Sequence, residues 1–192
     1  MQIAIIDNYD SFVYNIVRYV NDTTGRKAIV MRNDKIDFDL LEKVDAIVLS
    51  PGPAIPSEAG ELMKVIDLFH TKKPILGICL GHQAIGEYFG ANLVQNAFPL
   101  HGKSTMINKL IEDKLFSDLP PKFEVGRYHS WSIEINSSVL EVTTQTDESE
   151  VMSFRHSFLP IYGLQFHPES ILTPHGRQII KNWVATIQLK SQ

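Results

Sequence analysis

Cysteine is almost absent from this 192-residue sequence, because Cys79 is the only one. A single cysteine excludes an intramolecular disulfide, and an unpaired thiol suits a reducing cytoplasm. No apolar run approaches the roughly 18 residues of a membrane-spanning helix. The amino-terminal segment also lacks the positively charged start of a signal peptide. We therefore expect a cytoplasmic protein that is not held in a membrane.

Strong charge of either sign is also missing. The 18 Lys and Arg residues face 22 Asp and Glu residues, which gives a net charge of −4. Nucleic-acid binding usually needs a clearly basic surface, so nucleic acid is not an expected partner. Spacings of the type CxxC or HExxH, which would indicate a metal site, are absent, and so are GxGxxG and Walker-type loops. We expect neither a metal site nor a nucleotide site.

The first half of the chain alternates short apolar runs with segments of helical period. Continuous apolar runs are typical of parallel strands that are covered on both faces. The expected strands are Ile3–Ile6, Ala28–Met31, Ala46–Leu49 and Ile75–Ile78. The expected helices run from a cap at Asp10 or Ser11 to about Val20, from a cap at Ser57 to about His70, and from about Gln83 to Tyr88.

From about Asn92 to Phe166 the segments become shorter and partly alternate in polarity, which indicates mainly antiparallel strands. These strands are expected at Ser104–Asn108, Phe123–Tyr128, Leu140–Gln145, Val151–Arg155 and Ile161–Phe166. Thr173 and Pro174 are a typical start for a last helix that reaches about Leu189. We predict one α/β domain over residues 1–192: an open, mostly parallel sheet with helices on both faces and additional antiparallel strands.

Cys79 lies between an apolar strand and a helix, with Gly77 and Gly81 on either side. A nucleophile on a strand-to-helix turn has this pattern, in which small neighbours let the backbone bend sharply. The N-terminus of the following helix favours a thiolate, and the Leu80 amide would suit an oxyanion hole. The alternative is that Cys79 is an inert core residue, as buried cysteines often are.

A thiol nucleophile needs a base and a group that orients the base. His167 follows an apolar strand, and Pro168 disfavours helical geometry at His167. In extended chain, Glu169 would then lie on the same side as His167 and could hold its imidazole. The alternative is an ordinary surface turn. The remaining histidines have no such partner pattern and are expected to be structural or solvated, with His82 pointing away from the turn.

The loop after the third expected strand, Ser50–Ala54, is rich in proline. It should open on the same sheet edge as Cys79, because ligands bind where parallel strands end. Gly52 can turn its amide inward as a second oxyanion donor. An ordinary proline-rich turn would look the same in sequence.

Three separated motifs resemble the class I (triad) glutamine amidotransferases: Ser50–Pro53, Gly77–Gln83 and Phe166–Ser170. Further segments are similar to the small subunits of anthranilate synthase and 4-amino-4-deoxychorismate synthase: Asp7–Phe12, His101–Lys103, Arg127–Trp131 and Ile171–Pro174. The resemblance covers essentially the whole chain and implies a flavodoxin-like fold.

The resemblance implies a glutaminase with Cys79 as nucleophile, His167 as acid and base, and Glu169 as the residue that orients His167. Gly52 and Leu80 would form the oxyanion hole. The implied glutamine-binding residues are Gly52, Pro53, Ala54, Gln83, Ser130 and Trp131. Ala54 departs from the family, which often has glycine there, and would cost energy if that site needs a positive φ.

The implied partner is a larger synthase subunit that binds chorismate and Mg²⁺, so no cofactor is expected in this chain. L-Glutamine is the implied substrate, and anthranilate formation is the favoured pathway. Aminodeoxychorismate formation, or service to both synthases, is the alternative. Two more distant alternatives are a free-standing cysteine hydrolase or γ-glutamyl peptidase, and a non-catalytic regulatory module that binds a partner.

Overall fold

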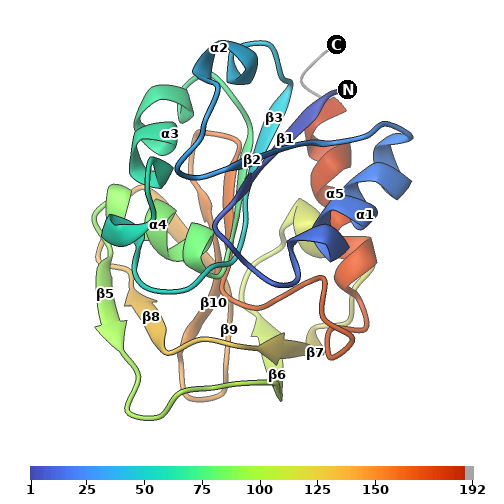
Figure 1. Cartoon of the computed structure of the whole chain (residues 1–192). Helices are drawn as coiled ribbons and strands as arrows, with labels where there is room; N and C mark the ends of the chain where they lie inside the picture. The colour runs from blue at the N-terminus through green and yellow to red at the C-terminus, as the bar shows by residue number, and fades with distance from the viewer. Residues whose placement is uncertain (189–192) are drawn as a thin grey trace.

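The computed structural model describes residues 1–188 and places them around one large sheet (Figure 1). Within this range the sheet has nine strands in the order β2-β1-β3-β4-β11-β10-β9-β6-β7. Its strands are β1 (Ile3–Asp7), β2 (Ile29–Arg32), β3 (Ala46–Leu49), β4 (Ile75–Ile78), β6 (Lys103–Lys109), β7 (Lys122–Arg127), β9 (Leu140–Gln145), β10 (Val151–His156) and β11 (Ile161–Leu164). The helices are α1 (Val13–Thr24), α2 (Phe38–Leu41), α3 (Leu62–Phe69), α4 (Leu80–Tyr88) and α5 (Gly176–Gln188), with short 3-10 turns at Pro56–Glu58 and Lys114–Phe116.

Five strands, β2-β1-β3-β4-β11, pair in parallel and form one half of the sheet. The chain runs from β1 outward to β2 and then returns to β3 on the other side of β1. In such an order, ligands bind beyond the carboxyl ends of the strands, where the winding direction reverses. The loops after β1, β3, β4 and β11 meet at this edge.

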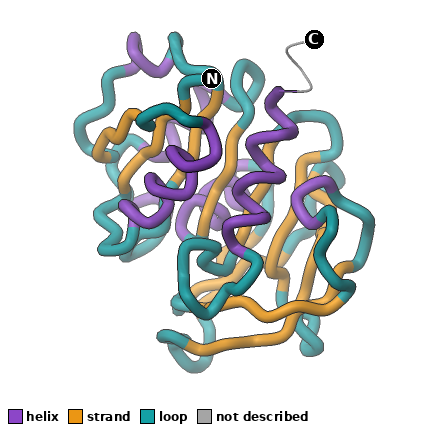
Figure 2. The backbone as a smooth tube through the Cα atoms, turned by 90° about the vertical axis from the view of Figure 1, so that its right-hand side faces the viewer, coloured by secondary structure: helices purple, strands orange, loops and turns teal. Residues whose placement is uncertain are grey.

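Alternate residues of the parallel strands face two separate cores, because successive side chains of a strand point to opposite faces. Ile3 and Ile5 face the core under α1 and α5, whereas Ala4 and Ile6 face the core under α3 and α4. Figure 2 shows α5 lying alongside the strands. Both faces are therefore covered, as predicted, and the α/β fold class is confirmed.

The other half of the sheet, from β10 to β7, is antiparallel and agrees with the predicted strands to within two residues. A separate antiparallel pair, β5 (Asn92–Gln95) and β8 (Trp131–Glu134), is absent from the prediction. These strands have four residues each and pair only with one another. The ends of β5 are exposed, so its sequence carries little of the apolar signal that marks a strand.

The caps predicted at Asp10 or Ser11, at Ser57 and at Thr173 are wrong, because each helix begins further along the chain. α1 begins at Val13, and Asp10 instead accepts a hydrogen bond from the Phe12 amide at 2.8 Å. Ser57 lies in a 3-10 turn, and α3 begins at Leu62. Thr173 donates to the His167 carbonyl at 2.7 Å, and α5 begins at Gly176. The predicted end near Leu189 lies outside the described residues.

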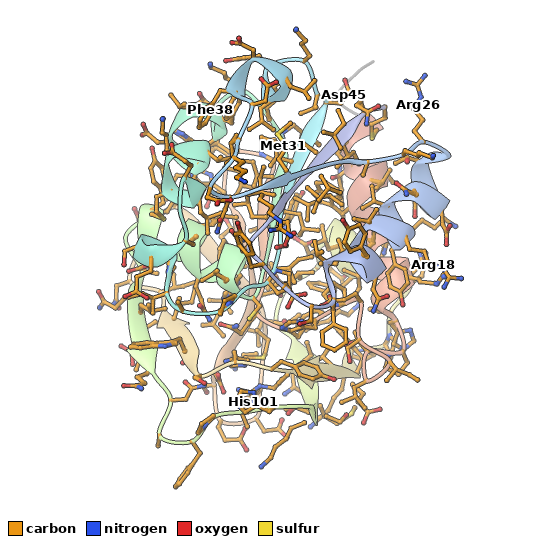
Figure 3. The ribbon with its side chains drawn as sticks, in the orientation of Figure 1. Arg18, Arg26, Met31, Phe38, Asp45 and His101 are labelled. Atoms are coloured by element: carbon orange, nitrogen blue, oxygen red, sulfur yellow. The ribbon has the colours of Figure 1, made fainter. Side chains whose placement is uncertain are left out.

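Charged side chains lie on the outside of the helical layers. Arg18 and Arg26 project from the α1 side of the molecule (Figure 3), and Arg18 is exposed beside Asp22. Among the described residues, no helix has both the length and the apolar character needed to cross a membrane.

Candidate active site

Cys79 forms the turn between β4 and α4, and its backbone is strained. Its φ is 51° and its ψ is −102°, a conformation that L-residues with a side chain rarely adopt. Two fixed elements hold it there, since the Cys79 amide donates to the Leu164 carbonyl at 2.7 Å and α4 starts at the next residue. The thiol is 5% exposed at the carboxyl edge of the sheet.

The glycines on either side of Cys79 are needed for close packing. A Cβ on Gly77 would lie 2.4 Å from the Gly81 carbonyl oxygen, and a Cβ on Gly81 would lie 2.4 Å from the Leu49 carbonyl oxygen. Neither glycine has a positive φ. We predicted these glycines because they would let the backbone bend sharply, and that reason is wrong. Cys79 itself makes the bend, and the glycines let α4 approach the strands.

The Gly52 loop lies against the start of α4. A Cβ on Gly52 would lie 2.9 Å from Cδ2 of Leu80 and 2.5 Å from the Asn8 carbonyl oxygen. Among the hydrogen bonds of residues 1–188, neither the Gly52 amide nor the Leu80 amide has an acceptor. Ala54, in the same loop, has a φ of 65°, so alanine does occupy a left-handed position there.

Asn8 holds this loop in place and is missing from the predicted site. Its amide donates to Ser50 Oγ at 2.9 Å, and its Nδ2 donates to the Ser50 carbonyl at 2.8 Å. Asn33 Nδ2 in turn donates to Asn8 Oδ1 at 3.0 Å. A polar residue directly after a buried strand is the signal that could have revealed it.

His167 and Glu169 lie together, buried, with 2.6 Å between His167 Nδ1 and Glu169 Oε1. The geometry differs from the extended chain that was predicted. β11 ends at Leu164, and the Ser170 amide donates to the His167 carbonyl at 3.2 Å, which closes a turn. Glu169 therefore reaches His167 across a turn, and Thr173 Oγ1 secures that turn through the same carbonyl.

The electrostatics of His167 favour its protonated form. Burial by itself lowers the pKa of the imidazole, but the charge of the nearby Cys79 sulfur and the Glu169 carboxylate raise that pKa well above its usual value. His167 Nε2 has no hydrogen-bond partner among the described residues. The sulfur and the carboxylate therefore favour the imidazolium form of His167, which leaves Nε2 able to donate a proton.

Behind the sulfur lies a second buried group that the sequence pattern did not single out. Gln165 is fully buried, and its Nε2 lies 3.8 Å from Cys79 Sγ as a hydrogen-bond donor. Gln83 Nε2 donates to Gln165 Oε1 at 3.2 Å and to the Trp131 carbonyl at 2.8 Å. A polar residue inside an otherwise apolar run before His167 is the available signal.

Trp131 lies beside α4 through its contact with Gln83, whereas Ser130 contacts Asn96, just after β5. The Ser130 carbonyl accepts from the Asn96 amide at 2.9 Å, and the Trp131 carbonyl accepts from Gln83. The structure thus gathers Cys79, Gly52, Leu80, His167, Glu169, Gln83 and Trp131 near one sheet edge.

His82 lies on the far side of the turn, as predicted, and packs on Phe154 with 4.7 Å between ring centroids. It is fully buried, and neither ring nitrogen has a hydrogen-bond partner in the described structure. Burial lowers its pKa to about 3, so the ring is neutral at physiological pH.

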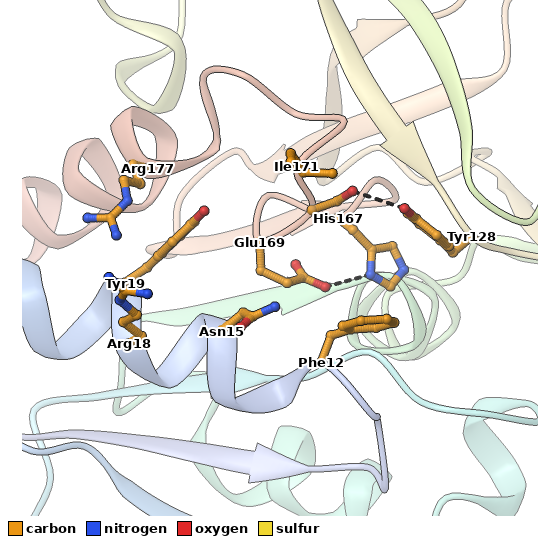
Figure 4. Close-up of a pocket in the computed structure, with 10 residues that line it drawn as sticks. Phe12, Asn15, Arg18, Tyr19, Tyr128, His167, Glu169, Ile171 and Arg177 are labelled. Carbon is orange, nitrogen blue, oxygen red and sulfur yellow. Dashed lines mark hydrogen bonds and ion pairs between the residues drawn. The ribbon is translucent and has the colours of Figure 1, made fainter.

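A cavity of about 350 Å³ opens beside the His167–Glu169 pair (Figure 4). Phe12 and Tyr128 lie next to the imidazole, and Arg177 closes the other end. The Tyr128 ring meets the His167 ring edge-on at 5.0 Å between centroids. Cys79 is not part of the lining, so this cavity approaches the base from the α1–α5 side.

Among residues 1–188, no group of three or more His, Cys, Asp or Glu side chains is arranged to hold a metal ion. The chemistry that the site offers by itself is that of a thiol nucleophile with an imidazole base, an orienting carboxylate and two unpaired backbone amides.

Comparison with known proteins gives consistent matches. Residues 4–187 match the family model described as Glutamine amidotransferase class-I. The chain is 43% identical over 189 residues to the aminodeoxychorismate/anthranilate synthase component 2 of Bacillus subtilis, covering 96% of both chains. It is 43% identical over 198 residues to the bifunctional protein TrpGD of Thermotoga maritima, of which the match spans only 33% of the length.

Among solved structures, a Thermoplasma acidophilum protein provisionally assigned to a GMP synthase has a TM-score of 0.88 and 30% identity. The match covers 100% of this chain and 96% of that one. The likeness therefore extends over the sheet, the helices and the edge that carries Cys79.

Proposed function

This chain belongs to the class I glutamine amidotransferase family, and we propose that it hydrolyses L-glutamine and delivers the ammonia to a chorismate-using synthase subunit for anthranilate formation. The observation that carries the proposal is the position of Cys79 on a strained turn at the start of α4, within electrostatic reach of the buried His167–Glu169 pair. The Bacillus subtilis relative is named for both anthranilate and aminodeoxychorismate synthases, which makes the second synthase the alternative partner.

In the first half of the reaction, the Cys79 thiolate attacks the side-chain carboxamide carbon of glutamine. The carbonyl oxygen takes the negative charge and accepts hydrogen bonds from the Gly52 and Leu80 amides, which have no internal acceptor. The His167 imidazolium then gives its proton to the nitrogen as the carbon–nitrogen bond breaks. The products are ammonia and a γ-glutamyl thioester on Cys79.

In the second half, the now neutral His167 takes a proton from water, and the resulting hydroxide attacks the thioester carbon. The same two amides hold the second oxyanion. Collapse breaks the carbon–sulfur bond and releases glutamate, while the thiolate and the imidazolium are restored. Glu169 keeps the imidazole in one orientation through both steps, because its carboxylate bonds Nδ1 and leaves Nε2 to face the reaction.

The residues proposed to hold the amino-acid end of glutamine are Gly52, Pro53, Ala54, Gln83, Ser130 and Trp131. Chorismate and Mg²⁺ belong to the synthase subunit in this proposal, so the chain itself uses no cofactor.

Reconstitution with a chorismate-using synthase subunit tests the proposal. The complex should form anthranilate from chorismate with either glutamine or ammonium as nitrogen source. Cys79→Ser should abolish the glutamine-dependent reaction and leave the ammonium-dependent reaction intact. A variant that still used glutamine would overturn the assignment of Cys79. A synthase subunit that binds this chain and forms 4-amino-4-deoxychorismate instead of anthranilate would favour the aminodeoxychorismate alternative.

A further inference from the structure

Three side-chain and backbone groups form a buried line of hydrogen bonds that ends on the nucleophile. The Trp131 carbonyl accepts from Gln83 Nε2 at 2.8 Å, Gln165 Oε1 accepts from the same nitrogen at 3.2 Å, and Gln165 Nε2 reaches Cys79 Sγ at 3.8 Å. Gln83 is 3% exposed and Gln165 is fully buried. Water therefore does not compete for these bonds.

The Trp131 carbonyl at the start of this line decides which group donates and which accepts in every later hydrogen bond. A backbone carbonyl only accepts hydrogen bonds, so Gln83 must turn its NH₂ group toward Trp131. Both hydrogens of that group are then used, one on Trp131 and one on Gln165. Gln165 must present its oxygen to Gln83, and its own NH₂ group is left facing the sulfur.

The Trp131 carbonyl is itself anchored from the other side. His129 Nδ1 lies 2.9 Å from it, and His129 Nε2 accepts from Arg127 Nε at 3.2 Å. Arg127 is 6% exposed and forms an ion pair with Glu150. Burial and the nearby Arg127 charge lower the pKa of His129 to about 3, so the ring stays neutral and keeps its single donor on Trp131.

We propose that Gln165 donates a hydrogen bond from Nε2 to the Cys79 sulfur and thereby stabilises the thiolate, with its orientation imposed by Gln83 and the anchored Trp131 carbonyl. Since this gives Gln165 a role at the reacting atom, it rests on the proposed function in taking Cys79 as the nucleophile. A hydrogen bond to a charged form favours that form, and more so where the bond is desolvated.

Other charged groups near the pair act mainly on His167. Glu169 bonds its imidazole, Asp10 lies within electrostatic reach from the loop before α1, and neutral His129 lies on the β7–β8 side. Gln165 is an uncharged group that contacts the sulfur itself. Its removal should therefore change the titration of the thiolate more than that of the surrounding carboxylates.

The rate of Cys79 alkylation by iodoacetamide, measured from pH 5 to pH 10, tests the proposal. The chain has one cysteine, so the adduct is unambiguous. Gln165→Met keeps the length of the side chain and removes the donor, and it should raise the pH midpoint of alkylation by about one unit. Gln145→Met is the matched control. Gln145 lies on β9 and takes no part in the line of hydrogen bonds to Cys79, so this variant should keep the wild-type midpoint.

A folded Gln165→Met protein with the wild-type midpoint would overturn the proposal. If that variant does not fold, Gln83→Met carries the test: loss of its two donated bonds releases the Gln165 carboxamide, and the midpoint should again rise. An unchanged midpoint in folded Gln83→Met would equally overturn it.

Glutamine hydrolysis by the same samples, in complex with a synthase subunit, separates the two proposals. At pH values below the wild-type midpoint, Gln165→Met should lower kcat by about 10-fold, because one unit of midpoint there corresponds to tenfold in thiolate population, and it should leave KM within about twofold. Wild type that shows the expected alkylation profile but no glutamine hydrolysis would overturn the proposed function and leave the thiolate assignment standing.

Discussion

At the scale of single residues, a buried carboxylate contributes, with the Cys79 sulfur, to the charge state of the base. Glu169 lies 2.6 Å from His167 Nδ1, and both side chains are buried. The carboxylate and the Cys79 sulfur together overcome the effect of burial, which on its own would lower the pKa of the imidazole. A neutral replacement at position 169 should therefore change both the rate and its pH dependence.

Glu169→Gln should lower kcat for glutamine hydrolysis by about 100-fold, which is within the usual contribution of acid–base catalysis. The variant should also move the basic limb of the kcat–pH profile to lower pH, since loss of the negative charge lowers the pKa of the imidazolium that protonates ammonia. Steady-state kinetics of the synthase complex from pH 6 to pH 10 would measure both effects. A basic limb at the wild-type pH would contradict this role of Glu169.

His82 makes a second prediction at this scale, because its pKa is about 3 in the fold and near 6.5 in an unfolded chain. Between these two values the unfolded chain binds more protons, so stability should rise with pH across this window. His82→Leu should reduce that slope by up to about 1.4 kcal/mol per pH unit. Urea unfolding at pH 4, 5, 6 and 7 is the measurement, and a His82→Leu variant that keeps the wild-type slope would contradict the prediction.

At the scale of elements, the loop after β3 contains a strained residue. Ala54 has a φ of 65°, and a left-handed conformation costs an L-residue about 1–2 kcal/mol. The expectation that alanine would be costly here is thus justified by the backbone. Glycine would relieve the strain, although it also gives the unfolded chain more freedom.

Ala54→Gly should raise the free energy of unfolding by up to about 1 kcal/mol, the difference between these two effects. Ala185→Gly, at an exposed position of α5, is the opposite control and should lower it by about 1 kcal/mol. Urea unfolding of both variants at pH 7 would show the two signs. A loss of stability in Ala54→Gly would show that the loop gains something else from the methyl group.

Helix starts were the least predictable elements, and the reason is local. Asp10, Ser57 and Thr173 are all good capping residues by type. In the fold, Asp10 bonds the Phe12 amide and Thr173 bonds both the His167 carbonyl and the Gly126 amide. Their oxygens are therefore used by loops of the site, and the helices begin two or more residues later.

At the scale of the whole molecule, large apolar side chains are exposed around the His167 cavity. Phe12, Tyr14 and Ile171 are 53%, 69% and 93% exposed. Phe12 and Ile171 line the cavity itself. A partner that receives ammonia has to meet this edge of the sheet, so we expect these side chains to contact the proposed synthase subunit.

The double variant Phe12→Ser, Ile171→Ser should weaken binding of the synthase subunit by at least about 10-fold, because it removes two large apolar contacts. Phe158→Ser is the control: Phe158 is 81% exposed but lies between β10 and β11, at the opposite edge from Cys79. Analytical ultracentrifugation or calorimetry would compare the affinities. If Phe158→Ser weakened binding of the synthase subunit as much as the double variant, the assignment of the interface to the edge around Phe12 and Ile171 would be wrong.

The strands of the parallel half were predictable from the sequence, and so were Cys79, His167 and Glu169 as neighbours of strand ends. These features depend on local apolar runs and on residue types at fixed spacing, which the chain carries without reference to its fold. The pair β5–β8 and the 3-10 turn at Pro56–Glu58 were not predicted. These segments are short, and the sequence of β5 carries little of the apolar pattern that marks a strand.

How the site is held together depends instead on the tertiary structure. Asn8 and Gln165 gain their significance from partners far along the chain, Ser50 and Cys79. The strained φ of Cys79 is imposed by β11 on one side and by close packing of α4 on β3 and β4 on the other. The single cysteine was visible in the composition, but its surroundings come from strands and loops that meet only when the sheet is assembled.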